Sequence, residues 1–453
     1  MSSRTSTTAL SAGALIAFAL LNVPLAGALM PLGVYLPAFY AQHLGTGLAM
    51  AGTLLMVSRV WNALLDPVIG VLSDRTRGRF GRRKPWIASG GILFLCGALA
   101  LFVAVSGQES AWYLGIWLVV FYLGWTMVSI PLSAWSGELS QQYHERSRVQ
   151  SYAQTLTSIG LLLVLLIPAV LDWFGRHELD EKIRVMGWFI VATLVPALYF
   201  NLVYVREVVV AELPQRAHAG GVVQALKILF TDRLLLRVIA SDLAVSLGQG
   251  MRGALFIFFV THCAGLPTWA SSLWLLQFVF GVFAAPIWLR LSYRLGKHKT
   301  AVAGELVQVA INLGLLLVGV GDAWLLLALT IGQGLAQGSG NLMLRAIVAD
   351  VADQQRLDSG EERAGLLFSI FNMTSSLAMA LAVALAFALV GHFGFAPQAV
   401  NGAQALQGLQ WVFALGPALC HFISALLVWN FPLDERRHAE ICAQLAARGI
   451  DSD

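Results

Sequence analysis

Three polar side chains in a membrane-length apolar run share one helical face. Arg59, Asn62 and Asp66 follow one another at i, i+3 and i+7, which in an α-helix places them within about 60° of one another. An ionised side chain at mid-membrane costs at least about 2.5 to 3.5 kcal/mol, so such groups face a bundle interior or a wet cavity and mark function by default. The alternative is an ion pair that only holds helices together. Arg59 and Asp66 are two turns apart, so that pairing needs a neighbouring helix or water.

The amino-acid composition of the chain indicates a membrane protein. The chain has 453 residues, of which 58% are hydrophobic and 12% are charged, and its mean hydropathy is +0.72, whereas a soluble domain is about 25% charged. Lipid offers no partner for exposed backbone amides, so each crossing needs a helix of about 20 mostly apolar residues. We therefore predict an all-α membrane protein with about twelve transmembrane helices.

The apolar runs come in two sets of six. Their approximate ranges are 12–40, 48–72, 86–105, 111–136, 150–171, 185–205, 234–260, 269–291, 300–320, 323–348, 364–390 and 407–431. The first run is too long for the apolar core of a signal peptide, so we expect it to be retained as the first helix. We predict an N-terminal six-helix bundle over 1–206, a cytoplasmic linker over 207–232, a C-terminal six-helix bundle over 233–432 and a cytoplasmic tail over 433–453.

Basic residues gather in alternate connections, as they do on the cytoplasmic side of membrane proteins. The connection after the second run carries Arg75, Arg77, Arg79, Arg82, Arg83 and Lys84, whereas QHLGTG, SGQES and HCAGLPT carry no Lys or Arg. We predict that both chain ends are cytoplasmic and that the net charge of +4 reflects topology and not a nucleic-acid partner. No paired or metal-like spacing relates the four cysteines, which are Cys96, Cys263, Cys420 and Cys442. We therefore expect them to serve as small core residues.

The two halves repeat a cytoplasmic turn. GVLSDRTRGRFGRRK follows the second run of the first half, and WLRLSYRLGKHK follows the second run of the second half. Parallel repeats of six helices are typical of one large class of secondary transporter.

The motifs make this comparison more specific. Gly70, Asp74, Arg75 and the Gly81-Arg82-Arg83 group resemble the cytoplasmic signature of the major facilitator superfamily, stretched by a few residues. With Arg59, Trp61, Asp66-Pro67 and Lys84-Pro85-Trp86, and with AIVADVAD over 346–353, the chain resembles the glycoside-pentoside-hexuronide:cation symporter family, which is melibiose permease-like.

The resemblance implies a cation site on the face described above. The family builds that site from two aspartates at the positions of Asn62 and Asp66, and this chain keeps the second. Sodium, a hard cation, wants several oxygen ligands, whereas a lone carboxylate in a low-dielectric site can carry a proton. We therefore expect proton rather than sodium coupling through Asp66, with Asn62 and Thr126 beside it, and no other cofactor.

The sugar contacts of the family are largely replaced. Its sugar-binding acids fall on Ala26 and Ser129, and its later arginine, tryptophan and lysine fall on Gln154, Asn341 and Ser376. Amides and hydroxyls can still bind the hydroxyl groups of a sugar, although each such residue alone is more often a contact between helices. The expected substrate-binding residues are Arg59, Ser129, Gln154, Gln249, Arg252, Asn341, Asn372 and Ser376. Asp242, at i−7 from Gln249, lines the same cavity or forms a structural pair, as does Arg252.

Charges at the ends of the helices suggest a gate. Asp74 opposes the basic charge of its connection, so pairing with other elements explains it better than topology does. The expected gate residues are Asp74, Arg75, Arg82, Arg83, Glu138, Arg345, Asp350 and Asp353. Glu305 is a further partner, or it extends towards the membrane surface. Gly334 and Gly338 are four residues apart, which favours close helix packing.

We predict a secondary transporter that works by alternating access, with proton-coupled symport of a sugar, glycoside or similar small polar solute. No nucleophile triad, H-E-x-x-H motif or nucleotide loop is found, so we expect no enzyme. A lysolipid or other amphiphile carrier of the same fold is the alternative, and a channel or receptor is a remote one. The expected partners are a small-molecule substrate, a coupling cation and the lipid bilayer, for a monomer in a bacterial inner membrane.

Overall fold

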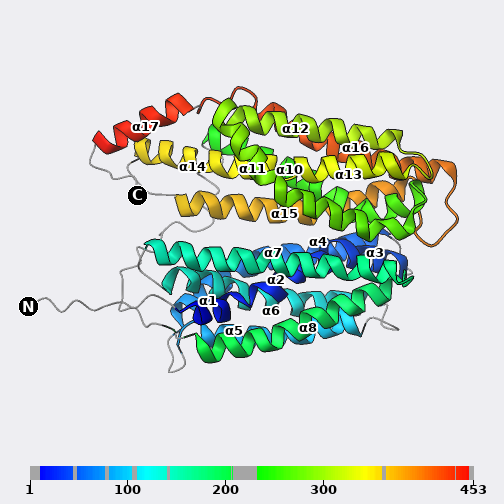
Figure 1. Ribbon diagram of the computed structural model, residues 1–453, viewed down its shortest axis with the longest axis horizontal. Helices are drawn as coiled ribbons and strands as arrows, with labels where there is room; N and C mark the ends of the chain where they lie inside the picture. Colours follow the sequence, from blue (N-terminus) through cyan, green and yellow to red (C-terminus); the bar gives the residue numbers. More distant parts are fainter. Residues whose placement is uncertain are drawn as a thin grey trace, which may run out of the picture. The chain divides into compact units, whose positions relative to one another are not determined.

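The computed structural model describes residues 11–43, 48–76, 81–104, 110–139, 143–205, 207, 232–359, 364–433 and 435–447. Within these residues the regular structure is entirely helical (Figure 1). The predicted linker lies almost wholly outside the described residues.

The elements follow the chain in two groups. The first comprises α1 (Ala12–Ala19), α2 (Asn22–Gly27), η1 (Pro31–Tyr35), α3 (Leu36–His43), α4 (Leu48–Arg75), α5 (Lys84–Ala98), η2 (Leu99–Val103), α6 (Ala111–Glu138), α7 (Tyr143–Trp173) and α8 (Leu179–Tyr204). The second comprises α10 (Arg233–Phe258), η3 (Phe259–Cys263), η4 (Pro267–Trp269), α11 (Ala270–Leu295), α12 (Lys297–Gly314), η5 (Leu315–Leu317), α13 (Ala323–Ala336), α14 (Ser339–Ser359), α15 (Ala364–His392), α16 (Ala403–Val428) and α17 (Glu435–Ala447).

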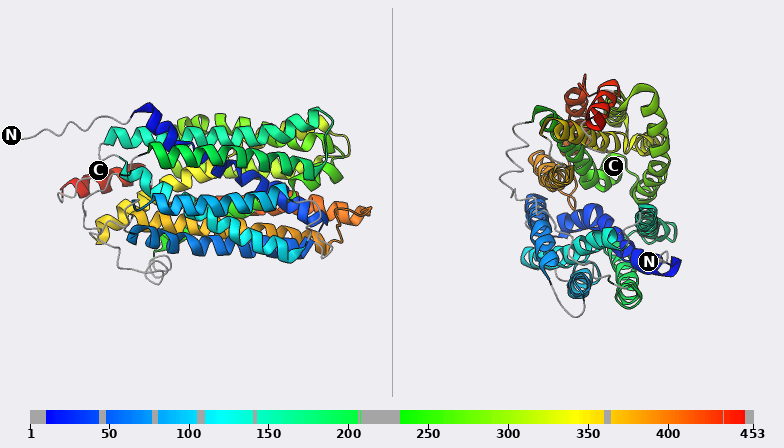
Figure 2. Two further views of the ribbon diagram at one scale, coloured as in Figure 1. Left: turned by 90° about the horizontal axis from the view of Figure 1, so that it is seen from below. Right: turned by 90° about the vertical axis from the view of Figure 1, so that its left-hand side faces the viewer.

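Two compact units contain these elements. Unit 1 consists of Met1–Leu44 and Val57–Gln215, and unit 2 consists of Gly45–Met56 and Arg216–Asp453. The first turns of α4 therefore belong to unit 2, whereas Arg59, Asn62 and Asp66 on the same helix belong to unit 1. Within each unit the long helices run alongside one another, as the end-on view in Figure 2 shows.

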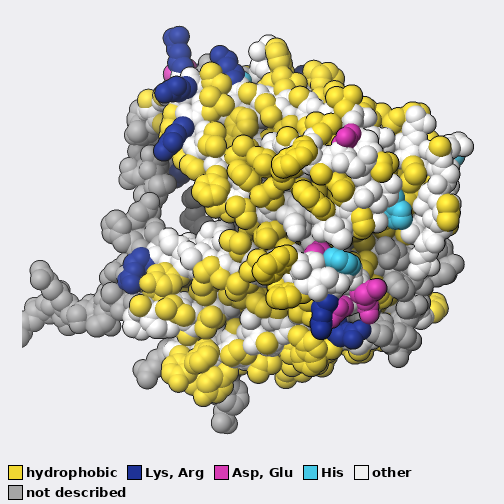
Figure 3. All heavy atoms as spheres, turned by 45° about the vertical axis from the view of Figure 1, so that its right-hand side comes forward, with side chains coloured by type: hydrophobic (Ala, Val, Ile, Leu, Met, Phe, Trp, Pro, Cys, Tyr) yellow, Lys and Arg dark blue, Asp and Glu magenta, His cyan; other side chains and the backbone are white. Residues whose placement is uncertain are grey.

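Eleven described segments are long and apolar enough to cross a membrane, judged by length and composition. The first of them, Ala12–Tyr40, is segmented because Pro24, Pro31 and Pro37 remove backbone donors. Figure 3 shows apolar side chains over most of the visible helical surface and charged side chains near the helix ends. Such a surface suits lipid around the helices and water at their ends.

The predicted helix 323–348 is wrong as one continuous element. It is divided into α13 and α14 at Gly338, whose φ of 85° lies in the left-handed region that favours glycine. A Cβ on Gly338 would meet nothing within 4 Å. Gly338 therefore allows the backbone to change direction between α13 and α14, and it does not serve close packing against another helix. A Cβ on Gly334, by contrast, would lie 2.5 Å from the carbonyl oxygen of Gln277 on α11, so Gly334 does permit the predicted close packing.

Glycine also lets α5 and α6, the helix that carries Thr126, pack closely. A Cβ on Gly124 would lie 2.2 Å from the backbone nitrogen of Phe94, and a Cβ on Gly97 would lie 2.7 Å from Cα of Phe121. The hydrophobic effect does not drive helices together within lipid. Close backbone contact therefore stabilises the α5–α6 pair through dispersion attraction. This contact positions α6 within unit 1.

Candidate functional site

The polar face of α4 meets α6 at the hydroxyl group of Thr126. The Thr126 side chain is fully buried, and its Oγ1 lies 2.8 Å from Oδ1 of Asn62 and 3.2 Å from Oδ1 of Asp66. The i, i+4 spacing of Asn62 and Asp66 brings both side chains to this hydroxyl. The structure therefore brings together the three residues predicted to bind the cation, which we call the Asp66 cluster.

The hydroxyl of Thr126 has one proton to donate and two oxygens within reach. If Asn62 presents its carbonyl oxygen and Thr126 donates to it, the contact with Asp66 is a hydrogen bond only when Asp66 is protonated and donates. If Asn62 presents its amide instead, Thr126 is free to donate to an ionised Asp66. The two orientations of an amide are not distinguished by its heavy atoms, so this arrangement accommodates both protonation states of Asp66.

Arg59 lies two turns before Asp66 and has its own partner. Its guanidinium donates a hydrogen bond to the hydroxyl of the buried Tyr122 on α6. A Cβ on Gly33 would lie 3.6 Å from Nη2 of Arg59, so η1 passes close to the same group. The interaction with Tyr122 was not predicted from the sequence, although position 122 precedes Thr126 by one helical turn and shares its face.

The other expected substrate residues of unit 1, Ser129 and Gln154, lie in different environments. Ser129, one turn after Thr126, has a buried hydroxyl oxygen with no hydrogen-bond partner among the described residues. Gln154 on α7 is exposed. A buried unpaired hydroxyl costs about 1 to 3 kcal/mol, so water or a ligand at Ser129 would stabilise the protein.

Unit 2 has a polar centre of different composition. Asp242 on α10 accepts a hydrogen bond from Ser375 on α15 and interacts electrostatically with Arg345 and Glu305. Glu305 on α12 lies 2.6 Å from Nδ1 of His421 on α16, and the two side chains are 3% and 1% exposed. We call these residues the Asp242 cluster.

The remaining predicted residues of unit 2 form two further groups. Arg252 is buried, with Nη1 3.2 Å from Oδ1 of Asn312, and its guanidinium lies 5.2 Å from the ring centre of Phe413. This favours the structural interpretation of Arg252, because amide and aromatic partners already surround its charge.

A second group connects α10, α14 and α15. Nδ2 of Asn341 lies 3.5 Å from Oε1 of Gln249, and Nη2 of Arg345 donates to Oδ1 of Asn372 at 3.0 Å. The Asn341 Oδ1 is buried without a hydrogen-bond partner among the described groups. Asn372 and Ser376 lie one turn apart on α15 and are exposed.

The predicted gate residues of unit 1 bind one another and a residue that we did not predict. Nη2 of Arg83 lies 2.6 Å from Oδ1 of Asp74, and the Arg83 side chain is 2% exposed. The backbone nitrogens of Arg82 and Arg83 donate to Oε1 of Glu207 at 2.6 Å and 2.8 Å. We expected Glu207 to belong to the linker. Its carboxylate instead accepts hydrogen bonds from the backbone of the turn that precedes α5. Arg75 is exposed, and the side chain of Glu138 lies outside the described part.

The gate residues of unit 2 also have partners within their unit. Nζ of Lys297 lies 2.6 Å from Oδ1 of Asp350, and Nε2 of His438 lies 3.0 Å from Oδ2 of Asp353. Both contacts bring a basic residue to the carboxylates of α14. The gating role of all eight residues stays a prediction.

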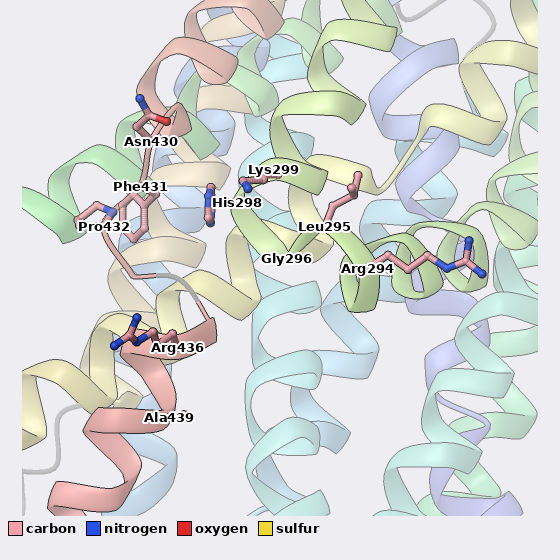
Figure 4. Close-up of a pocket in the computed structure, with 10 residues that line it drawn as sticks. All are labelled: Arg294, Leu295, Gly296, His298, Lys299, Asn430, Phe431, Pro432, Arg436 and Ala439. Carbon is pink, nitrogen blue, oxygen red and sulfur yellow. The ribbon is translucent and has the colours of Figure 1, made fainter.

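A cavity of about 700 Å³ lies elsewhere in unit 2. Figure 4 shows its lining side chains at the turn between α11 and α12, on the segment between α16 and α17, and at the start of α17. The lining residues are Arg294, Leu295, Gly296, His298, Lys299, Asn430, Phe431, Pro432, Arg436 and Ala439. None of the predicted substrate residues is among them, and its basic character matches the topological charge of the repeated turn.

Comparison with known proteins places this arrangement in a family. The family model described as MFS/sugar transport protein matches residues 17–435. The glucuronide carrier protein homolog of Escherichia coli (strain K12) is 24% identical over 92% of this chain and 91% of its own length. The raffinose carrier protein of Pediococcus pentosaceus is 25% identical over 91% of this chain and 68% of its own.

A solved structure supports the fold. The crystal structure of the nucleoside transporter NupG matches with a TM-score of 0.67 at 12% identity, covering 92% of this chain and 98% of that one. At this identity the match establishes the major facilitator fold alone. The family match over nearly the whole chain establishes more: the protein is an integral membrane transporter, not an enzyme, and it belongs to the MFS/sugar transport protein family of the major facilitator superfamily.

Proposed function

We propose that the protein is a proton-coupled symporter of a sugar, glycoside or similar small polar solute, in which Asp66 carries the coupling proton. The observation that carries this proposal is the Asp66 cluster. The half-buried carboxylate of Asp66 lies 3.2 Å from the hydroxyl oxygen of Thr126, which in turn lies 2.8 Å from Oδ1 of Asn62. A site with one carboxylate and no second acid changes its charge by one unit when it binds a proton.

The names of relatives support the substrate class. They include a glucuronide carrier homolog, a raffinose carrier and an isoprimeverose transporter. Ser129, Gln154, Gln249, Asn341, Asn372 and Ser376 supply neutral donors and acceptors suited to sugar hydroxyls, with Arg59 as a cationic donor. The names do not favour the lysolipid alternative, because each refers to a water-soluble sugar or glycoside.

Alternating access supplies the mechanism. Two six-helix bundles expose a central site to one side of the membrane and then to the other, and proton binding stabilises the substrate-loaded form that reorients. The chain ends face the cytoplasm of a bacterium in this proposal, as the basic connections indicate. The protein works as a monomer, because each molecule contains both bundles.

Transport in liposomes tests the coupling. Purified protein is reconstituted with a pH-sensitive dye inside, and a sugar panel of raffinose, a glucuronide and isoprimeverose is added outside. We expect one of these sugars to acidify the lumen without added sodium, and Asp66→Asn to abolish this acidification while sugar exchange persists. Proton movement that survives in Asp66→Asn, or uptake that requires sodium, would refute proton coupling through Asp66. Asp358→Asn, an exposed change on α14, is the matched control.

A further inference from the structure

The end of unit 2 brings together three side chains of metal-binding type. Asp353 lies on α14, and His438 and Cys442 lie one turn apart on α17. One ligand atom from each lies within 4.8 Å of the others. We call Asp353, His438 and Cys442 the tail cluster, because α17 belongs to the C-terminal tail. α17 packs against α14 within unit 2 (Figure 1).

Two of the three distances lie near those between the ligands of a tetrahedral ion, and the third is at most 4.8 Å. Zinc binds nitrogen and oxygen at about 2.0 Å and sulfur at about 2.3 Å, so its tetrahedral ligand atoms lie about 3.3 to 3.5 Å apart. In the tail cluster, Nε2 of His438 lies 3.0 Å from Oδ2 of Asp353 and 3.8 Å from Sγ of Cys442. Each of these two distances differs from the tetrahedral value by about 0.3 to 0.5 Å.

The helical spacing of residues on α17 and α14 brings two of the ligands, and an additional acid, close together. His438 and Cys442 are related by i, i+4, which directs two side chains to one ion as in helical metal sites. Asp350 lies one turn before Asp353, and its Oδ1 is 3.4 Å from Nε2 of His438. Lys297 also binds Asp350, at 2.6 Å, so Asp350 is suited to a hydrogen bond with a water ligand in the fourth position.

The chemistry of the donors selects the metal. A thiolate, an imidazole and a carboxylate together suit zinc better than magnesium or calcium, which prefer oxygen alone. Their two negative charges neutralise a divalent cation. The Asp353 and His438 side chains are 40% and 29% exposed, so an ion can enter from water. An ion pair between Asp353 and His438 explains two members of the cluster, whereas a metal ion explains all three.

We propose that Asp353, His438 and Cys442 bind a zinc ion that fastens α17 to α14. The ion joins two helices of one unit, and it stabilises the docked tail helix by its binding free energy. The tail cluster shares no residue with the Asp66 cluster.

Cobalt absorption tests the proposal on the full-length protein, purified without a polyhistidine tag and kept reduced. We expect one equivalent of Co²⁺ to produce a thiolate-to-cobalt charge-transfer band that one equivalent of Zn²⁺ removes. Cys442→Ser is expected to lose the band. Its zinc affinity should fall by at least the roughly 10- to 100-fold that loss of an outer-shell partner costs. His438→Gln is expected to weaken zinc to a similar extent.

Matched controls separate this site from other thiols and acids. Cys96→Ser removes an exposed thiol far along the chain, and Asp358→Asn removes a carboxylate that accepts from Gln354 on the same helix. Both should retain the band and the affinity. The absence of the band from the wild type, or an unchanged band in Cys442→Ser, would overturn the proposal. Size-exclusion and circular dichroism profiles identify any variant that misfolds, and His438→Gln then provides the deciding measurement.

Discussion

Both units place acidic side chains between helices, but the neighbours of these acids differ in charge. In unit 1, Oδ1 of Asp66 lies 3.2 Å from the Thr126 hydroxyl, which also contacts Asn62, and both of these neighbours are neutral. In unit 2, Asp242 and Glu305 are accompanied by Arg345 and His421. A carboxylate with neutral partners can lose its charge without leaving a cation unpaired, whereas protonation of a carboxylate beside an arginine leaves that arginine uncompensated. We therefore expect the charge that varies during transport to lie in unit 1, at Asp66, and the network of unit 2 to serve stability.

The largest expected effect is on the compensated network. His421→Leu removes the partner of Glu305, which is 2% exposed, and leaves a buried acid unpaired. Breaking a buried pair in this way costs about 3 to 5 kcal/mol. We expect a marked fall in the thermal unfolding temperature of the detergent-purified protein. The double variant Glu305→Leu/His421→Leu should recover most of the loss, because it leaves no charge uncompensated. A double variant as unstable as His421→Leu would show that the pair acts through shape and not through charge.

The second prediction concerns the hydroxyl that joins α4 and α6. Thr126→Val keeps the side-chain shape and removes the hydroxyl that contacts Asn62 and Asp66, at a cost of about 0.5 to 1.5 kcal/mol for each hydrogen bond lost. Because this hydroxyl accommodates both protonation states of Asp66, we expect the rate of proton-coupled uptake to fall more than the rate of sugar exchange. Ser375→Ala removes the corresponding hydroxyl beside Asp242 in unit 2. Equal loss of coupling in both variants would contradict the assignment of the variable charge to unit 1.

Much of this comparison could be predicted from the sequence, for a physical reason. Arg59, Asn62 and Asp66 share a face because helical periodicity acts over seven residues, and that periodicity is visible in an apolar run. The Glu305–His421 pair joins residues 116 positions apart, which no local pattern encodes. Ser375 and Tyr122 escaped prediction for the same reason, since their partners lie on other helices.

The helix break shows a different limit. Gly334 and Gly338 have the same sequence spacing that favours close packing, yet Gly334 contacts α11 and Gly338 has a φ of 85°. Glycine allows both roles because it lacks a Cβ. The surrounding packing, and not the residue type, determines which role each position takes.

A third prediction tests whether the missing acid determines the coupling ion. Asn62→Asp gives the Asp66 cluster the second carboxylate that the resembled family has there, and oxygen ligands of this kind suit a hard cation. We expect sodium to stimulate uptake in this variant by roughly tenfold, which corresponds to about 1.4 kcal/mol, while the wild type remains insensitive to sodium. Potassium at the same ionic strength is the control. A variant that ignores sodium but still couples to protons would mean that more than the charge of residue 62 excludes sodium.

The smallest expected effect concerns the exposed border of the Asp242 cluster. Asn372→Ala removes the acceptor for Arg345, whose guanidinium also lies 5.7 Å from the ring centre of Phe371. An exposed hydrogen bond of this kind contributes about 0.5 to 1.5 kcal/mol, and Arg345 keeps its aromatic contact and its attraction to Asp242. We therefore expect a small change in unfolding temperature and a larger change in the Michaelis constant for the sugar, because Asn372 is a predicted sugar ligand. Thr374→Ala, at a hydroxyl that bonds only its own helix, should change neither quantity appreciably. If Asn372→Ala lowers stability as much as His421→Leu and leaves the Michaelis constant unchanged, Asn372 belongs to the fixed network and not to the substrate site.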